Sequence, residues 1–327
     1  MKRYFSRSHQ IQFLFGGILL FVVFLFFFDS DVEVEKFQDF ILQRNVLPTD
    51  SGAEVLEKEE KRSRAERKAA WFQTQWQRRR AINETCSSID RKVLLETIYE
   101  TKESRKYLLY DDCHKAIYCA VPKVARSSWR KAWMLLSRMS FNVTGIGEDK
   151  IEEAFKERTM RDIQNRDDLK YRLTNYKKII VVRHPVERLL AVFLDDVHNP
   201  ALGSHVLPRV RQTRPEATIA NISWPEFVQY IISEGVIDSQ LLLPYEDVCH
   251  PCAIDYDFVV TLETFKEDSD NVVELLGGSK SERVQLSPIE EPLDGARVKA
   301  FVDSLSATEL KALKSKYRRD MKMFHYS

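Results

Sequence analysis

Glycine is scarce in this chain, with only ten glycines among 327 residues. So few glycines argue against several glycine-rich nucleotide loops, which need residues without a side chain where the backbone approaches phosphate. The Gly-Lys-Ser/Thr signature of nucleoside triphosphatases is also absent. The chain has no internal repeat and no low-complexity tract. We therefore expect an ordinary globular protein rather than a repeat array.

A charge excess of either sign is missing as well. Lysine and arginine number 50 against 49 aspartates and glutamates, so the formal net charge is +1. We therefore expect no nucleic-acid partner, and any attraction to a polyanion must come from a local patch. Hydrophobic residues make up 44% and charged residues 30% of the chain, which is usual for a protein with a real core.

The clearest segment in the chain is an apolar run near the N-terminus, at residues 11–28. As a helix it is about 27 Å long, close to the thickness of a thin bilayer. Basic residues precede the run and acidic residues follow it. The positive-inside rule then predicts a cytosolic tail at 1–10, a signal anchor at 11–28 and a luminal remainder. A cleaved signal peptide is the alternative, but no small-x-small cleavage site follows the run.

A luminal location changes how other residues are interpreted. Three sequons become candidate glycosylation sites, at Asn83, Asn142 and Asn221. An oxidising compartment favours disulfides, with one thiol left over. The cysteines concerned are Cys86, Cys113, Cys119, Cys249 and Cys252. Cys249-His-Pro-Cys252 could be half a zinc site or a redox pair, but no second CxxC follows, so structural disulfides are favoured.

Residues 29–85 have the composition of a stem. Acidic residues come first, and a stretch rich in Ala, Glu, Lys and Arg at 52–82 suits an exposed helix. Trp71, Phe72 and Trp76 need a partner surface. That surface is either the following domain or a second chain, so a homodimer through the stem is one expectation.

The pattern from Cys86 onward predicts an α/β domain at 86–327. An apolar strand at 116–121 precedes a helix at 128–139, and a strand at 178–182 precedes a helix from Pro185 to about 197. Apolar strands that alternate with helices imply a parallel sheet covered on both faces. Further segments predicted are a helix at 227–232, a strand at 256–262 and a helix at 308–322.

Two strand-to-helix loops have the composition of anion sites. The first, from Pro122 to Trp129, would present free backbone N–H groups and the positive end of a helix. Lys123 adds a charge, and Ser127 and Ser128 add hydroxyl donors, although Ser128 could be a mere N-cap. The second loop places Arg183 at a neighbouring strand end.

Four stretches together resemble one enzyme family. They are IYCAVPKVARSSW (117–129), KKIIVVRHPVERLLAVF (177–193), DVCHPCAIDYDFVVTLET (247–264) and the C-terminal Tyr317, Asp320 and Phe324-His325-Tyr326. They are similar to the chondroitin, dermatan and N-acetylgalactosamine 4-O-sulfotransferases, which are Golgi carbohydrate sulfotransferases. The resemblance implies a P-loop-like α/β sulfotransferase fold with a central parallel sheet, and a type II Golgi membrane protein. It also implies 3′-phosphoadenosine 5′-phosphosulfate (PAPS) as donor, a glycan acceptor and no metal.

The resemblance assigns site residues by position. Lys123, with Val124, Ala125, Arg126, Ser127, Ser128 and Trp129, would hold the phosphosulfate, and Lys123 would be catalytic. The 3′-phosphate would be held by Arg183, His184, Pro185, Val186, Glu187, Arg188, Leu189, Leu190 and Ala191. Arg188 could instead pair with Glu187 or Asp195.

This sequence departs from the family pattern at several of these positions. Ala191 replaces a serine, Arg126-Ser127-Ser128 replaces Cys-Thr-Asn, Leu241-Leu242-Leu243 replaces a segment with a His-Trp pair, and Thr261 replaces a lysine. These changes leave donor binding plausible and the acceptor open.

Some assignments stay open at the level of sequence. Candidate general bases are His184, His198, His205, Glu148 and Asp195. A basic rim for a polyanionic acceptor could come from Arg209, Arg211 and Arg214, after a break at 200–203. One rival reading is a metal-dependent glycosyltransferase, using Asp255-Tyr256-Asp257 or Asp268-Ser269-Asp270. The other is a catalytically silent glycan-binding relative.

Overall fold

A computed structural model describes residues 52–326 except 138, 141, 144, 156–157, 234–238 and 279–292. It divides the chain into two compact units, Met1–Arg64 and Ala65–Ser327. The predicted cytosolic tail and the anchor at 11–28 lie outside the described residues, as does the stem before residue 52. Within the described part, no helix is long and apolar enough to cross a membrane.

The second unit is built on a four-stranded sheet with the order β1-β2-β3-β4. The strands are β1 (Leu108–Asp111), β2 (Ala116–Cys119), β3 (Lys177–Val182) and β4 (Phe258–Thr261). The three predicted strands are confirmed, and they pair in parallel. β1 was not predicted and runs antiparallel to β2. The sheet is therefore mixed. A short turn joins β1 to β2, and a short turn can connect only antiparallel neighbours.

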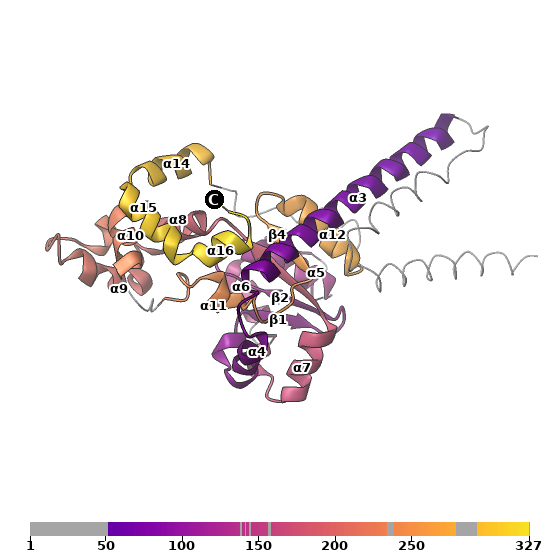
Figure 1. Cartoon of the computed structure of the whole chain (residues 1–327), viewed down its shortest axis with the longest axis horizontal. Coiled ribbons are helices and arrows are strands. Elements are labelled where there is room, and N and C mark those ends of the chain that lie inside the picture. The colour runs from indigo at the N-terminus through magenta and orange to yellow at the C-terminus, as the bar shows by residue number, and fades with distance from the viewer. Residues whose placement is uncertain are drawn as a thin grey trace, which may run out of the picture. The chain divides into compact units, whose positions relative to one another are not determined.

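Helices connect and cover the strands (Figure 1). The α-helices are α3 (Gly52–Thr85), α4 (Arg91–Glu100), α5 (Arg126–Leu136), α6 (Glu148–Phe155), α7 (Arg166–Asn175), α8 (Pro185–Asp196), α9 (Pro200–Val210), α10 (Trp224–Ser233), α11 (Tyr245–Cys249), α12 (Phe265–Leu275), α14 (Gly295–Asp303), α15 (Ala307–Lys316) and α16 (Arg318–Met323). Short 3-10 turns are η1 (Glu103–Arg105), η2 (Met160–Asp162) and η3 (Ile219–Asn221). The predicted α/β class is confirmed.

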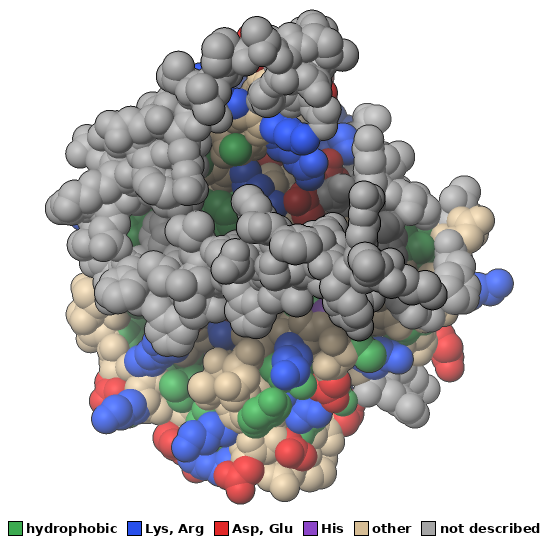
Figure 2. Space-filling view, turned by 90° about the vertical axis from the view of Figure 1, so that its right-hand side faces the viewer, with side chains coloured by type: hydrophobic (Ala, Val, Ile, Leu, Met, Phe, Trp, Pro, Cys, Tyr) green, Lys and Arg blue, Asp and Glu red, His purple; other side chains and the backbone are tan. Residues whose placement is uncertain are grey.

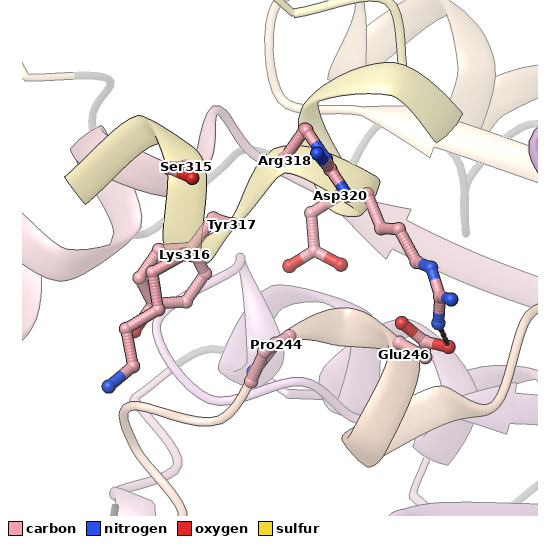
Figure 3. Close-up of a pocket in the computed structure, with 8 residues that line it drawn as sticks. Pro244, Glu246, Ser315, Lys316, Tyr317, Arg318 and Asp320 are labelled. Atoms are coloured by element: carbon pink, nitrogen blue, oxygen red, sulfur yellow. Dashed lines mark hydrogen bonds and ion pairs between the residues drawn. The ribbon is translucent and has the colours of Figure 1, made fainter. Parts of the chain in front are cut away.

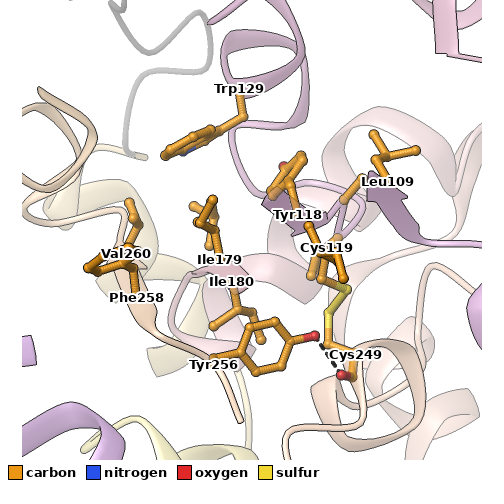
Figure 4. Packing of buried hydrophobic residues seen from close by; sticks show 14 of the residues in the cluster. Leu109, Tyr118, Cys119, Trp129, Ile179, Ile180, Cys249, Tyr256, Phe258 and Val260 are labelled. Atoms are coloured by element: carbon orange, nitrogen blue, oxygen red, sulfur yellow. Dashed lines mark hydrogen bonds between the residues drawn. A yellow bond between two sulfur atoms is a disulfide. The ribbon is translucent and has the colours of Figure 1, made fainter. Parts of the chain in front are cut away.

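The sheet is covered on both faces, as the apolar strands predicted (Figure 4). Neighbouring residues of β3 point to opposite faces. Trp129 of α5 lies on the Ile179 side, where its ring stacks on Tyr118 at 5.6 Å. Tyr256 lies on the Ile180 side, and its hydroxyl donates to the Cys249 carbonyl at 2.7 Å.

A second apolar cluster lies outside the sheet, among α8, α9, α10 and α15. Phe193 of α8 packs against Trp224 and Phe227 of α10, with ring centroids 5.5 and 5.7 Å apart. α8 therefore follows β3 and packs its buried face into this second cluster, which holds the helix rigidly.

The cysteines form two disulfides, Cys86–Cys252 and Cys119–Cys249. Cys113 is exposed and free. The structural interpretation of Cys249-His-Pro-Cys252 is confirmed, since each of its cysteines bonds a distant partner rather than the other. The second disulfide joins the end of β2 to α11, which ties the strand before the first loop to the opposite face of the sheet.

Two helix predictions need correction. Residues 200–203 do not break the chain but begin α9, because a proline in the first helical turn loses no hydrogen bond. The single helix predicted at 308–322 is two helices, α15 and α16. Tyr317 between them has non-helical backbone angles, and its hydroxyl donates to the Leu242 carbonyl at 2.6 Å.

The last part of the predicted stem belongs to the compact unit with the sheet. Trp71 of α3 is 3% exposed, and its indole N–H donates to Asp268 of α12 at 2.7 Å. Arg78 donates to the same carboxylate at 2.7 Å and to the Val259 carbonyl of β4. The partner surface that Trp71 needed is therefore the compact unit itself, which includes residues from Ala65 onward. The division into a stem at 29–85 and a catalytic domain at 86–327 stays a prediction.

Asp268 should be a principal stabilising residue of this contact. We expect Asp268→Ala to lower the free energy of unfolding by about 3–5 kcal/mol, because the half-buried Arg78 guanidinium loses its carboxylate. Urea denaturation with the disulfides intact measures this. Asp270→Ala on the same helix removes only a more exposed pair with Lys266 and should cost less than about 1 kcal/mol. Equal losses for both variants would show that α3 is not held through Asp268.

Candidate functional site

The loop after β2 has a backbone suited to binding an anion. Lys123 has φ +61° and Ala125 has φ +44°, a left-handed conformation that costs energy for residues other than glycine. Left-handed residues alternating along a turn point successive backbone N–H groups into a concave nest. Ala125 is also the N-cap of α5, and no side chain caps that helix. The positive N-terminal end of α5 therefore faces this loop.

The Lys123 side chain extends from this loop toward the C-terminal end of α8. Its ammonium lies 3.0 Å from a carboxylate oxygen of Asp195 and 3.0 Å from one of Asp196. Desolvation lowers the pKa of Lys123, but the hydrogen bonds to Asp196 and Asp195 outweigh it and the pKa is raised. Lys123 therefore carries its charge at neutral pH, and the loop and α8 are joined at this point.

Arg183, at the end of β3, is the second cationic element of the site. It is 2% exposed, and its Nε lies 3.5 Å from Glu187 as a loose ion pair. Its Nε and Nη2 are buried and have no hydrogen-bond partner in the described chain. A buried guanidinium with unused donors is costly unless an anion meets it. The neighbouring strands β2 and β3 are parallel, so both loops lie at the same edge of the sheet.

Arg188 is one turn further along α8 and has a different environment. Its guanidinium lies 4.8 Å from the Tyr245 ring centroid and donates to the carbonyls of Leu241 and Leu243. It forms no ion pair with Glu187 or Asp195, the partners that the sequence suggested. Arg188 therefore fixes the 241–245 segment beside the site.

Tyr245 supports the second loop from behind, and sequence reasoning missed it. Its hydroxyl accepts from the Arg183 N–H at 2.8 Å and donates to the Arg183 carbonyl at 3.1 Å. Its own N–H donates to Asp320 at 2.8 Å. Figure 3 shows the Asp320 carboxylate pointing from α16 toward the segment with Pro244 and Glu246. Burial raises the pKa of Asp320 to about 7, although the Tyr245 N–H lowers it.

Several predicted site residues can contact a ligand only through their backbone. Their side chains are buried in the two apolar cores, namely Val124, Ala125, Trp129, Val186, Leu189 and Leu190. The Trp129 N–H is already bonded to the Ala125 carbonyl at 3.0 Å. Pro185 occupies the first turn of α8, and Ala191 is buried on the same helix. Ser128 is 3% exposed, whereas Ser127 is half-buried in the first turn of α5.

The residues suggested as bases differ in their surroundings. His184 caps α8, with its Nδ1 accepting from the Val186 N–H at 3.2 Å. His198 has Nδ1 3.0 Å from the Ile219 carbonyl, so that nitrogen carries a proton and donates. His205 is exposed, and the Glu148 side chain is outside the described structure. Asp195 lies 3.0 Å from the Lys123 ammonium.

The arginines predicted as a basic rim, Arg209, Arg211 and Arg214, make local contacts around the end of α9. Arg214 makes an ion pair with Glu226 at 2.8 Å, and Arg211 donates to the Ala217 carbonyl at 3.0 Å. Both side chains stabilise the turn after α9. Arg209 contacts Gln212 on the same segment.

A cleft beside the first loop holds the basic residues that sequence reasoning missed. Its volume is about 620 Å³, and Pro122 and Arg126 of the loop line it. The other lining residues are Lys106, Tyr107, Ala120, Arg130, Glu152, Phe155, Thr159, Arg161, Ser239, Gln240 and Leu241. They come from six separate segments, so no local motif could have revealed them.

The Asp-x-Asp letters have structural uses here. Asp257, before β4, accepts from the Lys178 N–H at 2.9 Å, and Asp268 lies within α12, bonded to α3. Among the described residues no cluster of His, Cys, Asp and Glu could hold a metal ion. The sequon residues Asn83, Asn142 and Asn221 are exposed, and their glycosylation stays a prediction.

Known proteins resemble this chain over most of its length. It is 26% identical to Carbohydrate sulfotransferase 8 of Mus musculus over 270 residues, which are 78% of this chain and 64% of that protein. It is 27% identical to Carbohydrate sulfotransferase 9 of Homo sapiens over 276 residues, 78% of this chain and 60% of that protein. It therefore spans less than two thirds of these two relatives. For Carbohydrate sulfotransferase 11 of Danio rerio the identity is 28% over 274 residues, 76% of this chain and 75% of that protein.

No solved structure matches the chain. A sequence profile described as the sulfotransferase family matches residues 106–327, which include the sheet, both anion loops and the Tyr245–Asp320 support. The chain therefore belongs to the sulfotransferase family.

Proposed function

We propose that this protein transfers a sulfuryl group from PAPS to a hydroxyl of a glycan. The observation that carries the proposal is the buried Arg183 guanidinium with unused donors, at the same sheet edge as the uncapped nest around Lys123. A donor with two anionic ends suits two such loops. The relatives named carbohydrate sulfotransferases support a sugar as acceptor.

The residues present fit PAPS. The loop amides, Lys123 and Ser127 would bind the 5′-phosphosulfate, since they supply a charge, a hydroxyl and several N–H groups together. Arg183 and the first turn of α8 would bind the 3′-phosphate. The side chains of Trp129, Leu189 and Leu190 hold these backbones in place from the cores.

In the reaction, the acceptor hydroxyl oxygen forms a bond to sulfur while the bond from sulfur to the bridging oxygen breaks. The hydroxyl proton passes to a base, and 3′-phosphoadenosine 5′-phosphate leaves. Negative charge grows on the bridging oxygen, where a preorganised cation and N–H groups stabilise it. Lys123 suits this role because it is charged and lies in the loop.

Two carboxylates are placed to accept the proton. Asp195 is bonded to Lys123, and its side chain is 59% exposed. Glu152 lines the cleft beside the loop. His184 is a weaker candidate, because the Val186 N–H already occupies the lone pair of its Nδ1. His198 stays a candidate, because its Nδ1 donates to the Ile219 carbonyl and the Nε2 of the neutral ring keeps its lone pair.

We also propose that the protein is a type II Golgi membrane glycoprotein with a luminal catalytic domain. The apolar run at 11–28, its basic N-terminal flank and the sequons support this topology. Two disulfides suit an oxidising compartment. A homodimer through the stem stays a prediction.

Lys123→Ala should reduce sulfate transfer about 100-fold or more, because the cation acts mainly on charge that develops in the transition state. A radiosulfate assay with PAPS and a glycan panel measures transfer. Lys170→Ala, at an exposed position on α7, serves as the control and should retain full turnover. Near-normal transfer by a folded Lys123→Ala protein would remove this residue from the mechanism.

Ala191→Ser should tighten binding of 3′-phosphoadenosine 5′-phosphate by about 10- to 150-fold, because it restores a hydrogen bond to a charged group. Arg183→Ala should weaken the same binding strongly. Calorimetry with the nucleotide measures both. If neither substitution changes binding, α8 does not hold the 3′-phosphate, and a catalytically silent relative becomes the better interpretation.

The topology can be tested in intact microsomes. We expect protease to spare nearly the whole chain until detergent is added, and glycosidase to lower its mass. Replacing the asparagines of the three sequons provides the control for the mass shift. Digestion of the bulk of the chain without detergent would contradict the luminal location.

A further inference from the structure

The cleft next to the first loop has an excess of cationic side chains. Four of its lining residues are cationic, namely Lys106, Arg126, Arg130 and Arg161, and Glu152 is the one acidic residue among them. On the described part of the face that Figure 2 draws, lysine and arginine side chains are interspersed with aspartate and glutamate. A net positive cleft on a nearly neutral molecule points to an anionic ligand at this place.

Arg130 carries the strongest sign of a built site. It is 4% exposed and lies over the Phe155 ring at 5.4 Å. Its Nη1 pairs with Glu152 at 2.6 Å, while its Nε is buried and has no hydrogen-bond partner in the described chain. Burial lowers the pKa of Arg130, and nearby Arg126 lowers it further. Two adjacent guanidinium groups share one carboxylate, so positive charge is left over.

Glu152 is the shared partner of this pair. It lies 2.8 Å from Arg126 and 2.6 Å from Arg130, and its own side chain is 48% exposed. An incoming anion therefore competes with a half-exposed carboxylate for two guanidinium groups. Arg161 also lines the cleft. It pairs with Glu103 at 2.8 Å, and its side chain is 50% exposed, so it remains accessible to a ligand.

The neutral lining of the cleft suits a sugar. Tyr107 donates its hydroxyl to the Gln240 side chain at 2.7 Å, and Thr159 and Ser239 add further hydroxyl groups. Aromatic rings beside hydroxyl and amide groups offer an apolar surface and hydrogen bonds together. Because Arg126 belongs to both the loop and the cleft, a chain in the cleft reaches the donor site.

We propose that this cleft binds an acidic acceptor, a glycan segment with carboxylate or sulfate groups beside the accepting sugar, through Arg126, Arg130 and Arg161. The proposal rests on the proposed function and selects one of the two acceptor types that the family resemblance leaves open. A neutral N-acetylgalactosamine-terminated chain would leave these cations without a ligand.

The test measures the affinity of two oligosaccharide probes by calorimetry. The protein is the full-length chain saturated with 3′-phosphoadenosine 5′-phosphate. The probes are a hexasaccharide of alternating uronate and N-acetylgalactosamine and its carboxyl-reduced, neutral counterpart. We expect the acidic hexasaccharide to bind about 10-fold tighter or more at low salt, with the difference shrinking as salt screens the charges. Equal affinities, or no binding of the acidic probe, would overturn the proposal.

Variants locate the effect in the cleft. Arg161→Gln and Lys106→Gln should each weaken the acidic probe about 3- to 10-fold and leave the neutral probe and the nucleotide unchanged. Glu152→Gln should strengthen binding of the acidic probe, because two guanidinium groups lose their internal partner. Damage to the fold would weaken binding instead, so the opposite signs separate charge from structure.

Arg166→Gln is the matched control, since Arg166 is an exposed arginine paired with Glu96 and does not line the cleft. It should change neither affinity. An equal effect of Arg166→Gln and Arg161→Gln would overturn the proposal. Loss of nucleotide binding in the unmodified protein would contradict the proposed function itself, whereas intact nucleotide binding without acidic preference contradicts only the acceptor assignment.

Discussion

The hydroxyl of Tyr245 closes two hydrogen bonds on the backbone of Arg183, and the arrangement of the site depends on this contact. Arg188 lies over the same ring, and Asp320 holds the backbone of Tyr245. Three segments distant in sequence thus meet at one buried aromatic side chain. Hydrogen bonds are stronger in such a poorly solvated environment, so this network fixes the backbone orientation of Arg183.

This arrangement has a cost in stability. Arg183, Arg188 and Arg130 are all nearly fully buried, and each keeps guanidinium nitrogens that find no hydrogen-bond partner among the described residues. Left-handed backbone at Lys123 and Ala125 adds local strain. Such features persist only where the surrounding structure is stable enough to hold them. The two disulfides and the Asp268 contacts to α3 supply that stability on other sides of the sheet.

The departures from the family pattern have different physical meanings. With alanine at position 191, the serine hydroxyl of the family pattern is missing from a buried position on α8. The helix therefore offers one hydrogen-bonding group fewer. Arg126 adds a charge, and its pairing with Glu152 connects the first loop to the basic cleft. Leu241 and Leu243 offer their carbonyls to Arg188, so this segment is held by its backbone. Under the proposed function, the loss at Ala191 concerns donor affinity, whereas the charge added at Arg126 concerns the acceptor side.

The amino-acid sequence by itself determined the α/β class, the two strand–loop–helix units and the role of the cysteines as disulfide partners. These features depend on local patterns, since apolar runs, Pro185 and the loop composition act within a few residues. Local pattern was insufficient for β1, whose four residues LLYD are too short to show a period. It was misleading for α9, where Pro200 begins a helix.

The tertiary structure alone decided which distant side chains meet. It paired Cys86 with Cys252 and Cys119 with Cys249, placed Tyr245 on Arg183, and gathered Lys106, Arg126, Arg130 and Arg161 around one cleft. The local sequence around each of these side chains does not indicate its distant partners. Their grouping follows from how the helices pack on the sheet and on one another, and packing depends on the whole chain at once.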